Sequence, residues 1–432
     1  MAKDRVIVGL DIGSSKITTL IATVSAEETI NIVGVSTVIS RGLRKGQVVD
    51  IDESVSVITG SLEGAERMAG VSVGNAYVGV GGAHIACQNS HGVVAVAQPE
   101  KEITIDDVSR VIDAAKAVSL PSSREIVHVL PRGFIVDSQE GIKDPLGMTG
   151  IRLEVETHII TGSSTAMRNL AKCVSEVGVD VDTLVYNGLA SSYSVLTETE
   201  KELGVILVDM GGGTTDICVY VEGALAHSAV LPIGARNITN DLAIGLRLSL
   251  ESAEKIKLAL TKKPKIAFEN QEAGVKKTEK EEDEINVADL SLPEEVKTIS
   301  RKTLIEGIIK PRLNEIFTMV GLEIKKSGLG GLTPSGIVIT GGGAETIGII
   351  EACKRTLAMP VRIGIPTGVT GLIDEIQNPA YATAMGLVLY GAKESQKNVE
   401  RRSLPQMGKF MQKIPLKGLT DKFVDLVKSF LP

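Results

Sequence analysis

Aromatic side chains are scarce in this chain of 432 residues, where they make up 3% of the total and tryptophan is absent. The core must therefore be built mainly from Val, Ile, Leu and Ala, and aromatic surfaces on which single-stranded nucleic acid could stack are not expected. The formal net charge of −7 gives no general attraction for nucleic acid either. No nucleic-acid partner is therefore expected.

Long apolar runs and paired cysteines are also missing. No stretch of about 18 apolar residues is present that could span a bilayer as a helix. The four cysteines lie far apart and form no CxxC pair, which argues against zinc ribbons and thioredoxin-type sites and indicates buried thiols in a reducing compartment. The amino terminus runs almost directly into a strand pattern and lacks the features of a secretory signal, so we expect a cytoplasmic protein.

Three turns rich in glycine and hydroxyl side chains each follow an apolar strand pattern. The first turn is Asp11–Lys16, and the second turn, Asp209–Thr215, repeats it at an offset of 198 positions (209 minus 11). The third turn is Gly341–Gly343, followed by a helical pattern. Two copies of one pattern at so large a spacing predict two similar α/β halves that face each other.

The three turns have the chemistry of a phosphate site. Glycine lets the backbone N–H groups approach a ligand closely, and Ser and Thr hydroxyls can donate to phosphate oxygens. Lys16 adds a positive charge, and two facing carboxylates, Asp11 and Asp209, suit Mg²⁺ that keeps several waters. The predicted phosphate-binding residues are Asp11, Gly13, Ser14, Ser15, Lys16, Asp209, Gly211, Gly212, Gly213, Thr214 and Thr215.

Other catalytic and nucleotide motifs are missing from the sequence. There is no GxxxxGKS/T loop, no GxSxG turn and no HExxH, and the five histidines show no ligand spacing. Gly79–Gly82 resembles a dinucleotide fingerprint only loosely, so we interpret it as the end of a strand. A phosphate site built by the three turns is thus the main chemical signal.

The last residues of the chain carry an amphipathic helical pattern. Between Lys409 and Pro432 there are five lysines and two aspartates, which gives +3 in a protein of net −7. The lysines favour an anionic membrane surface, whereas packing on the main body or on a partner would give the same apolar stripe. The predicted membrane-facing residues are Leu419, Phe423, Leu426, Val427, Phe430 and Leu431.

Several stretches make the chain resemble the FtsA family of bacterial cell-division proteins, within the actin/Hsp70/sugar-kinase ATPase superfamily. The similarity runs from Val6 to the terminal helix, and the segment 41–52 is specific to the division proteins. The stretches that carry the resemblance are residues 9–16, 41–52, 188–193, 209–216 and 240–243.

The resemblance implies an α/β, actin-like ATPase fold, with two lobes around an ATP cleft and an inserted α+β subdomain 1C that replaces subdomain IB. It implies that Gly341, Gly342 and Gly343 pass the adenine and ribose. Ala253–Lys257 matches a helix motif that contacts adenosine in the Hsp70 branch, so Glu254 and Lys257 are further adenosine candidates, although an ion pair between them explains the spacing equally well. The implied cofactors are ATP and Mg²⁺.

The resemblance also implies a division of the chain into parts. The expected parts are lobe IA (1–82, 163–200 and 378–392), subdomain 1C (83–162), lobe IIA (201–237 and 305–377), subdomain IIB (238–304), a linker (393–417) and an amphipathic membrane-targeting helix (418–432).

One residue departs from the pattern of the superfamily. Hsp70-like chains carry a carboxylate, and actin a glutamine, to orient the attacking water, whereas the aligned stretch here places Asn187. Asparagine cannot act as a base and its side chain is shorter, so slow hydrolysis at best is expected. No catalytic residue is assigned.

The function implied is that of an ATP-binding actin homologue that polymerises at the cytoplasmic face of the bacterial membrane. It would anchor FtsZ filaments and recruit other division proteins during septum formation, with itself and anionic inner-membrane lipids as further partners. A small-molecule kinase of the same fold and a PilM-type pilus-assembly adaptor are the alternatives. A chaperone of the Hsp70 type is less favoured, because no peptide-binding domain follows.

Overall fold

The computed structural model describes residues 5–98, 102–261, 283–287, 290–294, 298–372 and 376–403. Its internal contacts separate a large unit, residues 1–391, from a second unit that begins at Ala392. The predicted amphipathic helix, 418–432, lies outside the described residues. Within the described part, no helix is both long enough and apolar enough to cross a bilayer.

The first half of the large unit is a six-stranded sheet with the order β11-β6-β1-β2-β3-β19. β1, β2 and β3 form an antiparallel meander, and β6 and β11 continue the sheet in parallel beside β1. The strands are β1 (Arg5–Ile12), β2 (Lys16–Val24), β3 (Ile30–Ile39), β6 (Asn75–Val80), β11 (Asp180–Tyr186) and β19 (Thr370–Gly371).

The second half repeats this topology in a five-stranded sheet with the order β14-β13-β12-β17-β18. β12, β13 and β14 form the antiparallel meander, and β17 and β18 are the parallel neighbours of β12. Apart from the additional edge strand β19 of the first sheet, the two sheets have the same strand order, so the predicted duplication is confirmed. The strands are β12 (Val205–Met210), β13 (Thr215–Val221), β14 (Ala224–Leu231), β17 (Ile337–Thr340) and β18 (Val361–Ile363).

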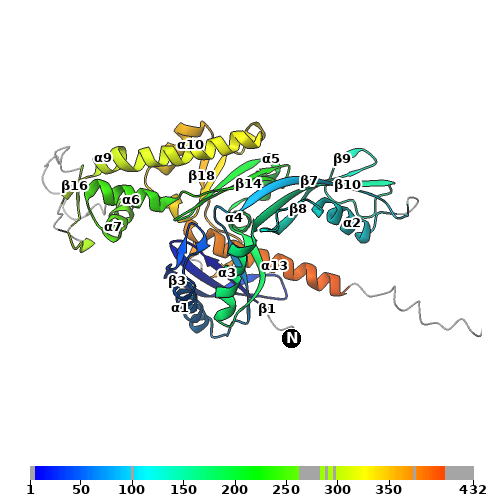
Figure 1. Cartoon of the computed structure of the whole chain (residues 1–432), viewed down its shortest axis with the longest axis horizontal. Helices are drawn as coiled ribbons and strands as arrows, with labels where there is room; N and C mark the ends of the chain where they lie inside the picture. The colour runs from blue at the N-terminus through cyan, green and yellow to red at the C-terminus, as the bar shows by residue number, and fades with distance from the viewer. Residues whose placement is uncertain are drawn as a thin grey trace, which may run out of the picture. The chain divides into compact units, whose positions relative to one another are not determined.

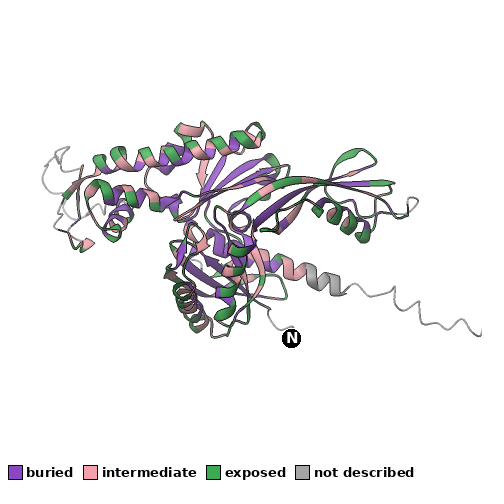
Figure 2. Cartoon of the chain, in the orientation of Figure 1, coloured by how far each residue is buried: buried purple, intermediate pink, exposed green. Residues whose placement is uncertain are grey.

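Every residue of β12 is buried, and because successive side chains of a strand point to opposite sides, this central strand contributes to the cores on both faces of the second sheet. Ile206, Val208 and Met210 of β12 join one core cluster, which includes Phe317 of helix α10 (Lys310–Ser327). Val205 and Leu207 belong to a separate cluster with residues of the first half. The central strands β12, β13 and β17 are buried almost throughout, whereas the edge strands β14 and β18 are partly exposed (Figure 2). This burial on both faces explains why the first four residues of β12 are all apolar.

Helix α1 (Ile51–Ala69) packs on the first sheet and has well-defined ends. The side chain of Asp50 accepts a hydrogen bond from the backbone N–H of Glu53 at 2.9 Å, which caps the first turn. Gly70 ends the helix in the left-handed conformation, with φ of 70°. Glycine adopts this conformation without strain, which accounts for the end of the helix at this residue.

A separate antiparallel sheet, with the order β7-β10-β8-β9, is inserted between the strands of the first half. Helix α2 (Ile105–Lys116) covers it and helps to enclose a core of its own (Figure 1). A capping box between Thr104 and Asp107 starts this helix. The strands are β7 (Ala86–Ala95), β8 (Arg124–Val136), β9 (Gln139–Ile142) and β10 (Arg152–Ser163).

Helix α13 (Ala382–Ser403) runs further than the sequence predicted. Residues 393–403 were expected to begin a linker, and they are helical instead. No glycine or proline interrupts the chain between Gly391 and Pro405, and the residues between them include many good helix formers such as Ala, Lys, Glu, Gln and Arg. The polar composition therefore did not exclude a helix at the start of this segment, and the predicted linker, 393–417, stays a prediction.

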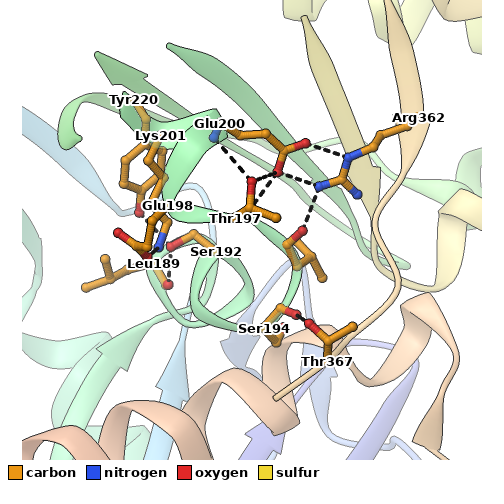
Figure 3. Close-up of polar contacts among 11 residues, drawn as sticks. Leu189, Ser192, Ser194, Thr197, Glu198, Glu200, Lys201, Tyr220, Arg362 and Thr367 are labelled. Atoms are coloured by element: carbon orange, nitrogen blue, oxygen red, sulfur yellow. Dashed lines mark hydrogen bonds and ion pairs between the residues drawn. The ribbon is translucent and has the colours of Figure 1, made fainter. Parts of the chain in front are cut away.

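The chain crosses between the two halves through α4 (Asn187–Val195) and α5 (Glu198–Leu203), where polar contacts fix its course (Figure 3). Arg362 of β18 donates to both carboxylate oxygens of Glu200 at 2.7 Å and to the carbonyl of Val195 at 2.8 Å. The backbone N–H of Thr367 donates to the carbonyl of Ser194 at 2.9 Å. These contacts connect the crossing directly to the second sheet.

Glu200→Gln should lower the free energy of unfolding by about 1–2 kcal/mol at pH 7, because the charged Arg362 loses its ionic partner and the amide offers one acceptor oxygen in place of two. Partial burial raises the pKa of Glu200, but hydrogen bonds from Arg362 and Thr197 outweigh it and leave the pKa below its usual value. The stabilisation should therefore be present above the unfolded pKa of about 4.3 and be lost as pH falls through the folded pKa.

Urea unfolding at pH 7 and at pH 3 measures this difference. Glu202→Gln is the matched control, because its pair with Lys143 is more than half exposed on both sides and should contribute within about 0.5 kcal/mol. An equal loss in the two variants would contradict the special role of the pair between Glu200 and Arg362.

Candidate functional site

The first and second turns meet in the structure. They connect β1 to β2 and β12 to β13, so they hold equivalent positions in the two sheets. A Cβ atom on Gly212 would overlap the hydroxyl of Ser15, and one on Gly213 would lie 3.1 Å from the Cβ of Ser14. The structure therefore brings together the two turns that the repeat predicted to face each other.

The two turns are also closed in the same way. The N–H of Gly13 donates to the carbonyl of Lys16 at 3.0 Å, and the N–H of Gly211 donates to the carbonyl of Thr214 at 2.9 Å. Thr215 differs from its predicted role, because its buried hydroxyl donates to the carbonyl of Ile233 at 2.8 Å. That hydroxyl proton holds the backbone in place, so it is not available to a phosphate.

The third turn lies against the second. Gly341 approaches the carboxylate of Asp209 so closely that any side chain there would overlap it. Gly343 lies against Met210, where an added Cβ would be 2.8 Å from the backbone oxygen. The parallel pairing of β12 with β17 explains this contact, because both strands end at the same edge of the sheet. All three predicted turns therefore meet at one place.

The carboxyl groups at the centre of the site are buried. Burial raises the pKa of Asp11 to about 7, against the attraction of Lys16 and together with the repulsion of Asp209. Burial also raises the pKa of Asp209, although hydrogen bonds from Ser191 and Thr383 and the charge of Lys16 oppose it. Burial lowers the pKa of Lys16, which Asp11, Glu345 and Asp209 counteract. The pKa values of Asp11, Asp209 and Lys16 are therefore coupled through their charges.

Asp216 is a third buried carboxyl group that the sequence reasoning did not assign. It lies directly opposite Asp209 in the pairing of β12 with β13, so the two side chains share one face of the sheet. Its Oδ1 atom is buried and has no hydrogen-bond partner among the described residues. Burial, followed by the charge of Asp209, raises the pKa of Asp216 well above its usual value.

The sequence repeat already distinguishes Asp216 from the equivalent residue of the first half. At the offset of 198 positions its equivalent in the first half is Thr18 (216 minus 198), which lies opposite Asp11. At this pair of strand positions, the second half therefore has two carboxylates where the first half has one. An extra acid at a buried, repeat-related position could have been identified from the sequence.

These carboxyl groups fit a hydrated divalent cation. Buried carboxylates with raised pKa values, one with an unpartnered oxygen, would be stabilised in their ionised form by a nearby cation. No three His, Cys, Asp or Glu side chains within the described ranges lie close enough to bind a metal directly. Contact with Mg²⁺ through water, with one or two carboxylates and several waters as ligands, stays a prediction.

Helix α4 connects Asp209 to the inserted sheet. The hydroxyl of Ser191 donates to Oδ2 of Asp209, and the hydroxyl of Thr383 donates to the same oxygen at 3.0 Å. At the start of the helix, the backbone N–H of Tyr186 donates to Nε2 of His128 in β8 at 3.0 Å. The helix that contacts Asp209 through Ser191 is therefore preceded by a residue that the inserted sheet holds.

Asn187, which the resemblance aligns with the water-orienting residue of related chains, is the first residue of this helix. Its side chain lies against Gly79 and Gly81, where an added Cβ would be 2.7 Å from Oδ1 and from Nδ2, respectively. Its Oδ1 atom is buried without a hydrogen-bond partner in the described part of the chain. The amide has no group that could act as a base.

Glu254 and Lys257 of α7 (Leu250–Thr261) form the ion pair that was the alternative to adenosine binding. Nζ of Lys257 donates to the Glu254 carboxylate at 2.7 Å and to the hydroxyl of Thr239 at 2.9 Å. Thr239 lies in α6 (Ala235–Leu246) and also donates to Glu254. The pair therefore connects two helices, and its contact with adenosine stays a prediction.

Solved structures with a similar fold define the class of the protein. A PilM-PilN type IV pilus biogenesis complex superposes with a TM-score of 0.63 at 14% identity, over 89% of this chain and 98% of that chain. MreB5 of Spiroplasma citri bound to AMPPNP gives a TM-score of 0.50 at 14% identity, over 92% and 98%. Two facing sheets of one topology, joined at phosphate-type turns, are thus an actin-like ATPase fold.

Sequence relatives narrow the class to one family. The profile described as "SHS2 domain inserted in FTSA" matches residues 82–161, and that of "Cell division protein FtsA" matches residues 206–386. A cell division protein FtsA of Pseudomonas aeruginosa is 43% identical over 394 residues, which are 90% of this chain and 90% of the relative. The chain belongs to the FtsA family and has a role in cell division.

Proposed function

We propose that this protein binds ATP with Mg²⁺ between its two halves and, in that state, polymerises on the cytoplasmic face of the membrane at the division site. The observation that carries the proposal is the meeting of the first and second turns around Asp11 and Asp209. Bound ATP would supply contacts to both halves and so hold the cleft closed. The AMPPNP bound to the MreB5 neighbour supports a nucleotide of this type.

Different turns would contact different parts of the nucleotide. The first and second turns would hold the phosphates, except for the Thr215 hydroxyl, and Asp11 and Asp209 would hold Mg²⁺ through water. Gly341–Gly343, with Glu254 and Lys257, would contact the adenosine. Lobes IA and IIA, subdomain IIB and the inserted subdomain 1C would keep the predicted boundaries, with subdomain 1C serving assembly and partner contacts.

The polymer would anchor FtsZ filaments to the membrane through the amphipathic stripe and recruit other division proteins during septum formation. Full burial of one Leu or Phe contributes about 1.5–3 kcal/mol, so six partly inserted residues give reversible binding of one copy. Many copies in one filament would bind far more strongly by multivalency. ATP would thus control membrane attachment through polymerisation.

Vesicle co-sedimentation tests this proposal. The full chain should sediment with vesicles that contain anionic lipid, and more strongly with Mg-ATP than without nucleotide. A chain that ends at Arg402, or one with Phe423→Asp and Phe430→Asp, should stay in the supernatant, because the apolar stripe is lost or charged. Unchanged sedimentation of these variants would show that the tail is not the anchor.

The same truncated chain, combined with an assay of phosphoryl transfer, distinguishes the alternatives. A kinase of this fold would show phosphoryl transfer to a metabolite and no effect of truncation. The PilM-type alternative shares the fold, but the FtsA profiles and the 43% identical relative favour the division protein.

A further inference from the structure

A short hairpin in the segment 41–52 has no role in the site described so far. It consists of β4 (Leu43–Arg44) and β5 (Gln47–Val48), joined by Lys45 and Gly46. Both connecting residues have positive φ, 51° and 75°. Two-residue loops of this kind favour glycine or asparagine, so a lysine at the first position is unusual.

The tip of this hairpin is fixed against the first turn. The N–H of Gly46 donates to the hydroxyl of Ser14 at 2.8 Å. On its other side Gly46 faces Gly82, where an added Cβ would be 2.7 Å from Cα and would also approach the backbone of Gly81. The position of the tip therefore leaves no room for a side chain at residue 46.

The tip also reaches the second turn. The Cα of Lys45 lies 3.4 Å from the position that a Cβ on Gly213 would take, and Ser14 lies at a similar distance from that position. The hairpin thus touches both turns at the line where they meet. Any ligand held between the two turns would have residue 45 at its boundary.

The chemistry of Lys45 suits an anionic ligand at that boundary. The side chain is exposed, and no carboxylate in the described part of the chain lies within ion-pair distance of it. A lysine is a flexible point charge with three donors and is a common ligand of phosphate. Lys16 supplies a second positive charge from within the first turn.

The contacts along the second turn indicate which phosphate group Lys45 would bind. The third turn, proposed to contact adenosine, lies against Asp209 and Met210 at the start of the second turn. Lys45 lies against Gly213, which is further along that turn. We propose that Lys45 binds the terminal phosphate of a nucleoside triphosphate and so favours the triphosphate over the diphosphate. This inference rests on the proposed nucleotide site.

Equilibrium binding of Mg-AMPPNP and Mg-ADP to the full chain tests the inference. Lys45→Gln removes the charge and shortens the side chain by one atom, and it should weaken AMPPNP binding about tenfold or more while changing ADP binding less than threefold. Arg44→Gln is the matched control, because it removes the same charge from the neighbouring exposed residue of the hairpin. Lys45→Arg should retain most of the AMPPNP affinity.

Each outcome has a distinct meaning. Equal weakening of both nucleotides by Lys45→Gln, or an equal effect of Arg44→Gln, would overturn the assignment to the terminal phosphate. Unchanged binding in Lys45→Gln would remove Lys45 from the site altogether. The urea midpoint of each variant should match that of the unaltered protein, which excludes misfolding. If the unaltered protein binds neither nucleotide, the proposed function fails rather than this inference.

Discussion

Asp209→Asn should make the nucleotide-free protein more stable while lowering its affinity for Mg-ATP by about 10–100-fold. The loss of affinity follows from removing one of the carboxylates proposed to hold the cation through water, since groups in that outer position typically contribute this factor. The two effects have opposite signs, which a merely structural role of Asp209 would not produce.

The gain in stability follows from the surroundings of Asp209. The residue is 5% exposed, and its raised pKa shows that the folded protein disfavours the ionised form. The hydroxyls of Ser191 and Thr383 can still donate to the amide oxygen of asparagine. We expect the free energy of unfolding without nucleotide to rise by about 1–2 kcal/mol at pH 8, as is common when a strained functional group is neutralised.

Urea unfolding and nucleotide binding on the same samples measure both effects. Asp113→Asn, an exposed change in α2, is the control and should alter neither quantity beyond about 0.5 kcal/mol. A less stable Asp209→Asn protein with unchanged affinity would mean that the carboxylate serves the fold and not the ligand.

The affinity for Mg-nucleotide should rise about tenfold between pH 6 and pH 8. Burial raises the pKa of Asp11 to about 7, so about one tenth of the molecules carry the ionised form at pH 6 and about nine tenths at pH 8. A cation needs the ionised form, and its binding therefore releases a proton at low pH.

The same pKa predicts the opposite trend for stability without ligand. The folded state keeps a proton on Asp11 that the unfolded chain has lost above pH of about 4, so the free energy of unfolding falls as pH rises from 4 through 7. Stability and affinity should thus move in opposite directions over neutral pH.

Titration calorimetry at pH 6, 7 and 8 tests the dependence. Asp11→Asn should bind more weakly and with a flatter pH profile, and protonation of the nucleotide itself affects both proteins equally. Asp209, Asp216 and Lys16 also titrate within the site, so some slope should persist in the variant. Identical slopes in the two proteins would show that Asp11 does not control cation binding.

Much of the architecture could be predicted from the sequence, because it depends on local patterns. The apolar runs, the turns after them and the repeat at 198 positions predicted two similar halves, and the two sheets share one strand order. The end of α1 at Gly70 followed from the left-handed conformation that glycine adopts readily.

Other features depend on contacts between distant residues, which local patterns do not contain. The hydroxyl of Thr215 donates a hydrogen bond to the carbonyl of Ile233. The tip of the hairpin, at Lys45 and Gly46, lies against Ser14 and Gly213. Helix α13 continues past Gly391 because no residue stops it, although its composition had indicated a linker.

The sequence by itself determined that two aspartate-led turns exist and that they follow equivalent strands, and it predicts an amphipathic stripe at 419–431. Only the tertiary structure decided which hydroxyls and carboxyl groups remain available at the site where the turns meet. The reason is physical: residue type and spacing set the backbone locally, whereas burial and hydrogen-bond partners, which fix the pKa values of Asp11, Asp209 and Asp216, arise only when the two sheets pack together.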